Sequence, residues 1–198
     1  VDKILEQSPD IVCIQELFWS KTKDIVCKKL REIYPYFYTD TRRGKYVIGV
    51  NSGLAIFSYY PIADQKLMTY SVYRGVENFA LKVCMYVKID ISPNEKKSHD
   101  IHHTKTSNDE GPSTINRLSR GKSAVSYTTK KYIHVFTTHL QSGIGSEPCI
   151  CRFFDKNQMS SYQLKMHQVD EIVSFIEKMA QNDIVVLTGD FNIRAKTN

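Results

Sequence analysis

An acid and an amide stand two positions apart near the end of this chain, as Asp190 and Asn192, directly after an apolar run that ends at Gly189. A run of Ile, Val, Val and Leu is typical of a strand buried on both faces. Glycine allows a sharp turn there, and ligands of α/β sheets bind just beyond the carboxyl ends of strands. Glu16 and His139 follow two other strand-like runs in the same way. The sequence therefore predicts that these four polar residues meet at one rim.

Each of these residues also has a purely structural interpretation. Glu16 suits the cap of the helix that follows it, His139 suits a hydrogen-bonded core position, and Asp190 suits the brace of a turn. These interpretations are hard to sustain jointly, because neighbouring strand ends bring such side chains together at the same edge.

The residue types match metal-assisted phosphodiester hydrolysis. Mg²⁺ prefers one or two carboxylates and keeps several waters, a role that suits Glu16. The reaction also needs an aligned water, a group to accept its proton and donors for the phosphoryl oxygens. Asp190 can accept from the water, Asn192 can orient phosphate or metal-bound ligands, and His139 can donate to the phosphoryl group.

Periodicity and turn residues predict the elements that must position this site. Helical spacing extends over residues 20–33 and 160–180, with the tail of another helix at 2–7. The helix at 20–33 is expected to bury Ile25, Val26, Leu30 and Ile33. The helix at 160–180 is expected to bury Leu164, Val169, Ile172, Val173 and Ile176. Strands are expected at residues 11–14, 36–39, 53–58, 67–73, 79–91, 132–138 and 184–189. Short hairpin-like spacings in the middle indicate mixed or antiparallel pairing.

Residues 92–130 have almost no hydrophobic periodicity and are predicted to be a flexible insertion. From Ser92 to Lys131 the chain has eight basic and four acidic residues, which supply +4 of the net charge of +6. This excess favours a polyanionic partner or an anionic membrane surface. Because it lies in a polar loop, it is weak support for a nucleic-acid groove. The three histidines in this loop are not expected to bind metal: His99, His102 and His103.

Composition indicates one globular domain spanning residues 1–198, with 41% hydrophobic and 24% charged residues. No apolar run approaches the roughly 20 residues that span a bilayer. Cys13, Cys27 and Cys84 lie in apolar patterns and are expected to be small core residues. Cys149 and Cys151 lack a second pair at zinc-ligand spacing.

Four motifs occur in an order that resembles the endonuclease/exonuclease/phosphatase superfamily, whose members include deoxyribonuclease I and apurinic endonucleases. The motifs are Pro-Asp-Ile-Val-Cys-Ile-Gln-Glu at 9–16, Ser-Gly-Leu-Ala-Ile-Phe-Ser-Tyr-Tyr-Pro-Ile at 52–62, Thr-His-Leu-Gln at 138–141 and Gly-Asp-Phe-Asn at 189–192. The segment from Phe79 to Ile89 and the Thr-His-Leu-Gln form are most similar to the neutral sphingomyelinase branch. The match covers nearly the whole chain outside the insertion.

The resemblance implies a four-layer α/β sandwich, in which two facing mixed β-sheets are flanked by helices. It implies that Glu16 binds the metal, that His139 contacts the phosphate and that Asp190 and Asn192 form the Asp-x-Asn pair. Mg²⁺ is the implied cofactor, with Mn²⁺ as an alternative. Two departures stand out, since Val83 replaces a usual glycine after Lys82, and Tyr59 replaces a usual arginine.

The resemblance also implies a strand before Val1 that carries a metal-site asparagine, and a closing Asp-His pair beyond Asn198. The chain is therefore expected to be a fragment that lacks both ends of the domain and is inactive, or nearly so, by itself. A soluble protein at the periphery of a membrane and a secreted protein both agree with these features, and the compartment and oligomeric state stay open.

The expected function of the parent protein is Mg²⁺-dependent hydrolysis of sphingomyelin to ceramide and phosphocholine at a membrane surface. Two alternatives remain. The first is a nuclease or inositol-phosphate phosphatase of the same fold, with nucleic acid as the alternative partner. The second is a catalytically inactive binding domain, which the Val83 departure and the long insertion would permit.

Overall fold

The computed structural model describes residues 1–42, 51–72, 81–92, 130–142 and 159–193 of the chain. Almost all of the expected insertion at 92–130 lies outside these residues, as do the histidine cluster at 99–103 and the Cys149 and Cys151 pair. Every residue proposed for the site lies inside them. No helix in these ranges is both long and apolar enough to cross a membrane.

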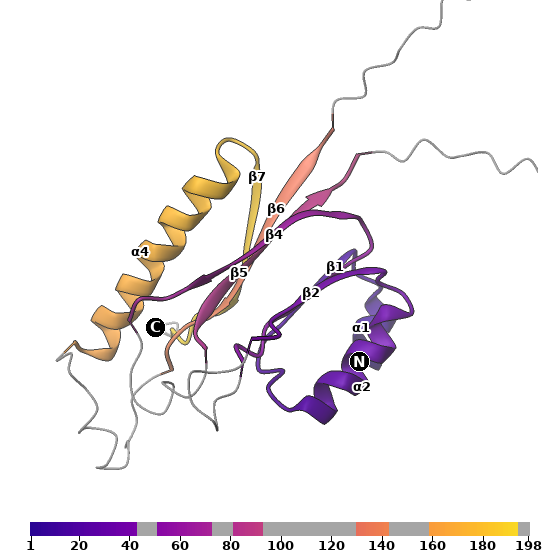
Figure 1. Ribbon diagram of the computed structural model, residues 1–198, viewed down its shortest axis with the longest axis horizontal. Coiled ribbons are helices and arrows are strands. Elements are labelled where there is room, and N and C mark those ends of the chain that lie inside the picture. The colour runs from indigo at the N-terminus through magenta and orange to yellow at the C-terminus, as the bar shows by residue number, and fades with distance from the viewer. Residues whose placement is uncertain (43–50, 73–80, 93–129, 143–158, 194–198) are drawn as a thin grey trace, which may run out of the picture.

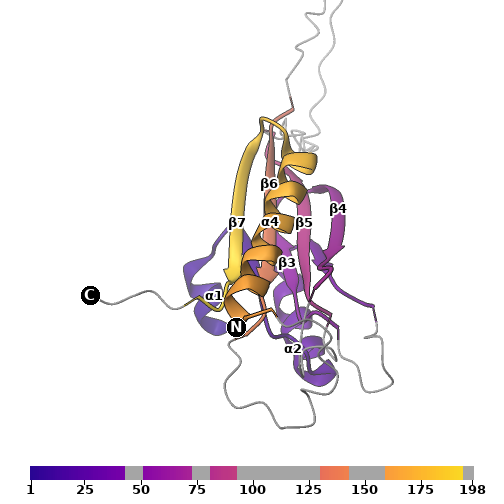
Figure 2. The same cartoon turned by 90° about the vertical axis from the view of Figure 1, so that its left-hand side faces the viewer.

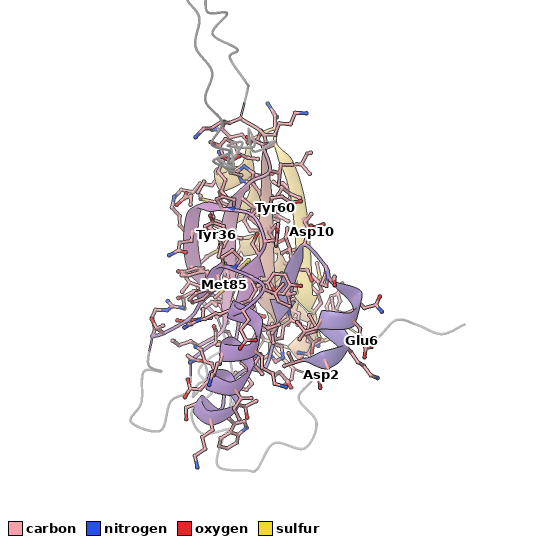
Figure 3. The ribbon with its side chains drawn as sticks, turned by 90° about the vertical axis from the view of Figure 1, so that its right-hand side faces the viewer. Asp2, Glu6, Asp10, Tyr36, Tyr60 and Met85 are labelled. Carbon is pink, nitrogen blue, oxygen red and sulfur yellow. The ribbon has the colours of Figure 1, made fainter. Side chains whose placement is uncertain are left out.

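The first sheet is antiparallel, and two helices cover its outer face. Its strands lie in the order β1 (Ile11–Ile14), β3 (Ala55–Ser58), β2 (Tyr36–Thr39), and the helices are α1 (Asp2–Gln7) and α2 (Ser20–Arg31). Leu30 and Tyr34 are fully buried beside Phe57 in the cluster that joins α2 to this sheet. Where β1 begins, the negative charge of Asp10 raises the pKa of Tyr60, and Figure 3 labels both residues.

The second sheet has the order β4 (Ile62–Thr69), β5 (Val83–Asp90), β6 (Tyr132–His139), β7 (Ile184–Asp190). Its first two pairs are antiparallel, whereas β6 and β7 run parallel. The parallel pair needs a crossover, and this crossover contains α4 (Ser161–Ala180). Ser160 begins α4 with a reciprocal pair of hydrogen bonds to Gln163, a capping box that satisfies two otherwise unpaired backbone amides.

The two sheets face each other across the main core, and helices cover both outer faces. Ile56 of β3, and Leu54 just before that strand, pack in one cluster with Met85 and Val87 of the second sheet. Figure 1 shows the four layers, with α4 on one side and α1 and α2 on the other, and Figure 2 shows α4 lying along β6 and β7. Met85, labelled in Figure 3, is fully buried in this core. The predicted four-layer α/β sandwich is confirmed, with a mixed second sheet and an antiparallel first sheet.

Several element predictions were wrong in detail. The strand expected at 67–73 is β4 at Ile62–Thr69, because Pro61 ends a turn and the strand begins directly after it. On α2, Ile25 and Ile33 are exposed, and Cys27 and Leu30 provide the buried face. On α4, Val173 is likewise exposed, whereas Gln168, which was not expected in the core, is fully buried.

The prediction that the last strand is buried on both faces was also wrong. Among the described strands, β7 pairs with β6 alone. Its apolar residues Ile184 to Leu187 are between 37 and 63% exposed. The apolar run correctly indicated a strand, but it could not indicate where the strand lies in the sheet.

The cysteine prediction holds for the described residues. Cys27 and Cys84 are buried and free, and Cys13 is partly buried and free. Burial raises the pKa of Cys13 and of Cys84 to about 12, so neither thiol ionises near neutral pH. They act as small apolar side chains.

Gly189 allows the close approach of β6 and β7. It has a φ of 144° and is paired with Thr138 in the parallel register. A Cβ atom there would lie 2.1 Å from the Thr138 carbonyl oxygen and 2.8 Å from its nitrogen. Both atoms belong to the backbone and cannot rotate away. The glycine before Asp190 is therefore a packing requirement as well as a turn.

We expect Gly189→Ala to lower the free energy of unfolding by about 2–4 kcal/mol, because it adds both a backbone clash and an unfavourable φ. Urea unfolding followed by far-ultraviolet circular dichroism measures the effect. A matched control is Gln181→Gly, because Gln181 has a φ of 47°, a backbone conformation that glycine adopts more readily than glutamine. This change should be neutral or stabilising by up to about 1 kcal/mol. Equal stability of Gly189→Ala and the parent chain would contradict the prediction.

Candidate active site

Glu16 is held at the end of β1 by contacts with both sheets. The side-chain nitrogen of Gln15 donates to Thr137 Oγ1 of β6 at 2.9 Å, which joins the end of β1 to the second sheet. The Leu17 amide donates to the Gly53 carbonyl at 2.8 Å. Between these two anchors Glu16 has a left-handed backbone, with φ of 61°, and its side chain is 68% exposed. The carboxylate therefore projects from a fixed backbone into the rim.

The loop at 52–54 forms the support behind Glu16. Gly53 also has a positive φ, of 66°, and a Cβ atom there would lie 2.7 Å from the Phe18 ring. Asp40 holds this loop, because its fully buried carboxylate accepts from the Ser52 amide at 3.3 Å. It also accepts from the Arg42 backbone and guanidinium at 3.0–3.2 Å. Burial acts to raise the pKa of Asp40, but these hydrogen bonds and the Arg42 charge outweigh it and lower the pKa.

His139 lies between two carboxylates. Its Nε2 atom is 3.9 Å from Glu16 Oε1 and 3.8 Å from Asp190 Oδ2. The parallel register places His139 directly opposite Asp190, and the Leu140 amide donates to the Asp190 carbonyl at 2.9 Å. The imidazole is largely buried, whereas Asp190 is half exposed. The structure thus brings together three predicted residues from three strands.

Asn192 completes the group through a tightly bonded turn. It has a φ of 53°, and its amide donates to Asp190 Oδ1 at 2.8 Å. The side-chain nitrogen of Asn192 donates to the Leu140 carbonyl at 3.0 Å. The backbone carbonyl of Asn192 accepts a hydrogen bond from Lys165 Nζ of α4. Asp190 therefore uses Oδ1 to hold the turn and directs Oδ2 toward His139. All four predicted site residues lie in this region.

The donor set fits a hard divalent cation better than a zinc-type centre. The described residues contain no group of three or more His, Cys, Asp and Glu side chains placed to hold a metal ion. The exposed Glu16 carboxylate offers oxygen donors at the open side of the rim, and the Asp190 carboxylate lies near the same imidazole. Mg²⁺ accepts one or two carboxylates and keeps water in its other positions.

Four supporting residues were missed as parts of the site. Besides Gln15 and Lys165, Lys82 Nζ donates to the Leu140 carbonyl at 3.1 Å, so this carbonyl accepts from both Lys82 and Asn192. The fully buried Gln168 accepts from the Gln141 amide and donates to the Val72 carbonyl. A polar residue inside an otherwise apolar pattern could have identified two of these supporting residues, Gln168 on the buried face of α4 and Lys82 before β5.

The Val83 departure has a structural answer. Val83 is 1% exposed and packs in the inter-sheet core, and its carbonyl accepts from Thr138 Oγ1 at 3.0 Å. The added side chain thus enters the core and does not fill the rim. Tyr59, at the other departure, is exposed and makes an edge contact with Tyr60.

We expect Asp40→Asn to destabilise the chain by about 2–4 kcal/mol at pH 7, because Arg42 then loses its anionic partner. Since the folded pKa of Asp40 lies below its ordinary value, this stabilisation is present above about pH 4 and is lost as the pH falls through the folded pKa. Urea unfolding at several pH values should show the two proteins converging in acid. Asp24→Asn, at an exposed position of α2, is the control, and a constant difference across the pH range would contradict the prediction.

No protein-family model matches the chain. By sequence it is 24% identical over 207 residues to a sphingomyelinase of Dictyostelium discoideum, a match that covers 96% of this chain and 38% of the relative. The chain thus spans less than half of that relative's length.

Three solved structures share the fold over nearly the whole chain. Sphingomyelinase C from Streptomyces griseocarneus has a TM-score of 0.62 at 17% identity, with 98% of this chain and 55% of that chain covered. A Staphylococcus aureus beta toxin variant with bound magnesium ions has a TM-score of 0.61 at 21% identity, with coverages of 95% and 53%. ANGEL2, a 2′,3′-cyclic phosphatase, has a TM-score of 0.53 at 14% identity, with coverages of 96% and 41%. These likenesses show the fold: the chain has the deoxyribonuclease I-like α/β-sandwich architecture that the four motifs led us to expect.

Proposed function

We propose that the chain carries most of the active site of a metal-dependent phosphodiesterase that hydrolyses sphingomyelin to ceramide and phosphocholine. The observation that supports this most directly is the position of His139 Nε2, within 4 Å of both Glu16 and Asp190. The named activity of the Dictyostelium relative and of the Streptomyces structure supports the choice of substrate class.

Each of the four residues has a separate role in the proposed hydrolysis. Water adds to phosphorus, the bond from phosphorus to the ceramide oxygen breaks, and that oxygen leaves with a proton. Asp190 Oδ2 can accept a proton from the attacking water, and Asn192 holds Asp190 in place through its amide. His139 Nε2 can donate to a phosphoryl oxygen as negative charge grows on it. Glu16 would hold Mg²⁺, which supplies positive charge at the phosphoryl oxygens when bound.

The nuclease and phosphatase alternatives share this chemistry and differ in what surrounds it. The likeness to ANGEL2 agrees with a phosphoesterase acting on another substrate. Substrate choice therefore needs a direct comparison between lipid and nucleic acid, carried out on the protein with its natural flanking sequence.

The test compares hydrolysis of sphingomyelin, duplex DNA and abasic DNA, with and without Mg²⁺. We expect release of phosphocholine that depends on Mg²⁺ and falls by at least about a hundredfold in His139→Ala, because a positioned acid or base contributes that much. Cleavage of DNA without lipid hydrolysis would refute the sphingomyelinase proposal and favour the nuclease. Loss of neither activity in His139→Ala would refute the site.

Glu16→Gln separates an enzyme from a binding domain. We expect this change to lower both turnover and the affinity for Mg²⁺, measured by titration of backbone amide chemical shifts in the 198-residue chain. Glu6→Gln, on the exposed α1 helix, is the matched control and should change neither. Mg²⁺ binding that is equal in Glu16→Gln and the parent chain would contradict the metal assignment.

A further inference from the structure

The segment that follows Glu16 turns progressively outward. Leu17 is buried in the core, Phe18 is partly buried with its ring centroid 6.5 Å from that of His139, and Trp19 is 78% exposed. Tryptophan is among the more buried residue types on average, so an exposed one beside a catalytic rim calls for an explanation. Trp19 is also the sole tryptophan of the chain.

Trp19 directly precedes α2, and this helix has an exposed face with basic and apolar side chains. Lys21, Ile25 and Lys28 are spaced by four and three residues, so they share one face of the helix, and all three are exposed. The α2 helix has five basic side chains and the single acid Asp24. We call Trp19, Lys21, Ile25 and Lys28 the α2 rim surface.

The basic residues of α2 fall into two groups. Lys23 donates to the Asp40 carbonyl, Lys29 lies 3.4 Å from Asp2, and Arg31 stacks 3.9 Å above the Phe37 ring. These three have roles in the fold. Lys21 and Lys28 form no ion pair with an acid of the described residues, so their charges face outward beside an exposed indole and an exposed isoleucine.

The α2 rim surface begins at the end of the molecule where β7 ends. Figure 1 shows the first turn of α2, the first turn of α4 and the end of β7 at the same end of the sandwich, while β7 begins at the other end. Trp19 directly precedes that first turn of α2 and Asp190 ends β7, so the exposed indole and the candidate site belong to elements that meet at this end.

We infer that the α2 rim surface is a contact site for a phospholipid bilayer that contains anionic lipid. Indole rings favour the boundary between headgroups and acyl chains, and exposed lysines next to apolar side chains are typical of helices that lie on membranes. Positive charge on Lys21 and Lys28 complements anionic headgroups. The meaning of this contact for catalysis rests on the proposed function, but the binding itself does not.

Because Trp19 is the sole tryptophan, its fluorescence reports directly on this surface. We expect vesicles of phosphatidylcholine with phosphatidylserine to shift Trp19 emission to the blue, and lipids brominated on the acyl chains to quench it. Vesicles of phosphatidylcholine alone should bind more weakly. An unchanged emission, or a shift produced by duplex DNA but not by vesicles, would overturn the inference.

Substitutions separate a specific surface from a general attraction by the basic chain. The double substitution Lys21→Gln and Lys28→Gln should weaken vesicle partition on the order of thirtyfold, since each lysine near an anionic surface raises the partition constant about fivefold. Trp19→Ala, followed by cosedimentation, should weaken it on the order of tenfold. Lys130→Gln with Lys131→Gln removes the same charge at exposed positions beside the start of β6, at the opposite end, and should leave partition unchanged. An equal loss in this control would overturn the inference.

Membrane binding and hydrolysis can be lost independently of each other. Glu16→Gln should bind vesicles like the parent chain while losing hydrolysis. Vesicle binding without phosphocholine release from the longer protein would refute the function and leave the membrane surface intact. Hydrolysis of sphingomyelin in detergent micelles, together with no vesicle binding, would refute the membrane surface and leave the function intact.

Discussion

The parallel pairing of β6 with β7 is the constraint on which the rest of the site depends. It places His139 opposite Asp190, and it requires Gly189 because no side chain fits against the Thr138 backbone. A shift of one residue in this register would turn Asp190 to the other face of the sheet and remove it from the imidazole. The α4 crossover makes the parallel pairing possible, and Lys165 on that helix also binds the turn that follows β7.

Two of the four site residues have strained backbones, and neighbouring hydrogen bonds hold both of them. Glu16 and Asn192 have positive φ although neither is glycine, a conformation that costs about 1 kcal/mol or more at each position. Gln15 and Leu17 hold Glu16, while Asp190 and Lys165 hold Asn192. Strain at both positions means that the surrounding fold, more than local preference, determines where these side chains point.

Much of the fold, and the meeting of the four candidate site residues at one rim, could be predicted from the sequence, because the relevant signals are local. A short apolar run followed by a polar residue marks a strand end, and the Ser160 and Gln163 spacing marks the start of a helix. The supporting contacts could not be predicted in this way. The Gln15 bond to Thr137 and the Lys165 bond to Asn192 join residues far apart in sequence, and only the packed sheets bring them together. The exposure of Ile25 and of β7 was missed for the same reason, since periodicity indicates an apolar face but not what covers it.

The exposed β7 edge has a consequence for handling the protein. Four consecutive apolar residues, Ile184 to Leu187, lie on a strand whose outer side has no partner among the described strands. Such an edge is a template on which a second molecule can add a strand, and it has no charged residue between Ile184 and Gly189 to prevent this. We therefore expect copies of the 198-residue polypeptide to associate through β7, at the edge of the second sheet. The single substitution Val186→Lys would place a positive charge on this edge and make the β7 edges of two molecules repel each other.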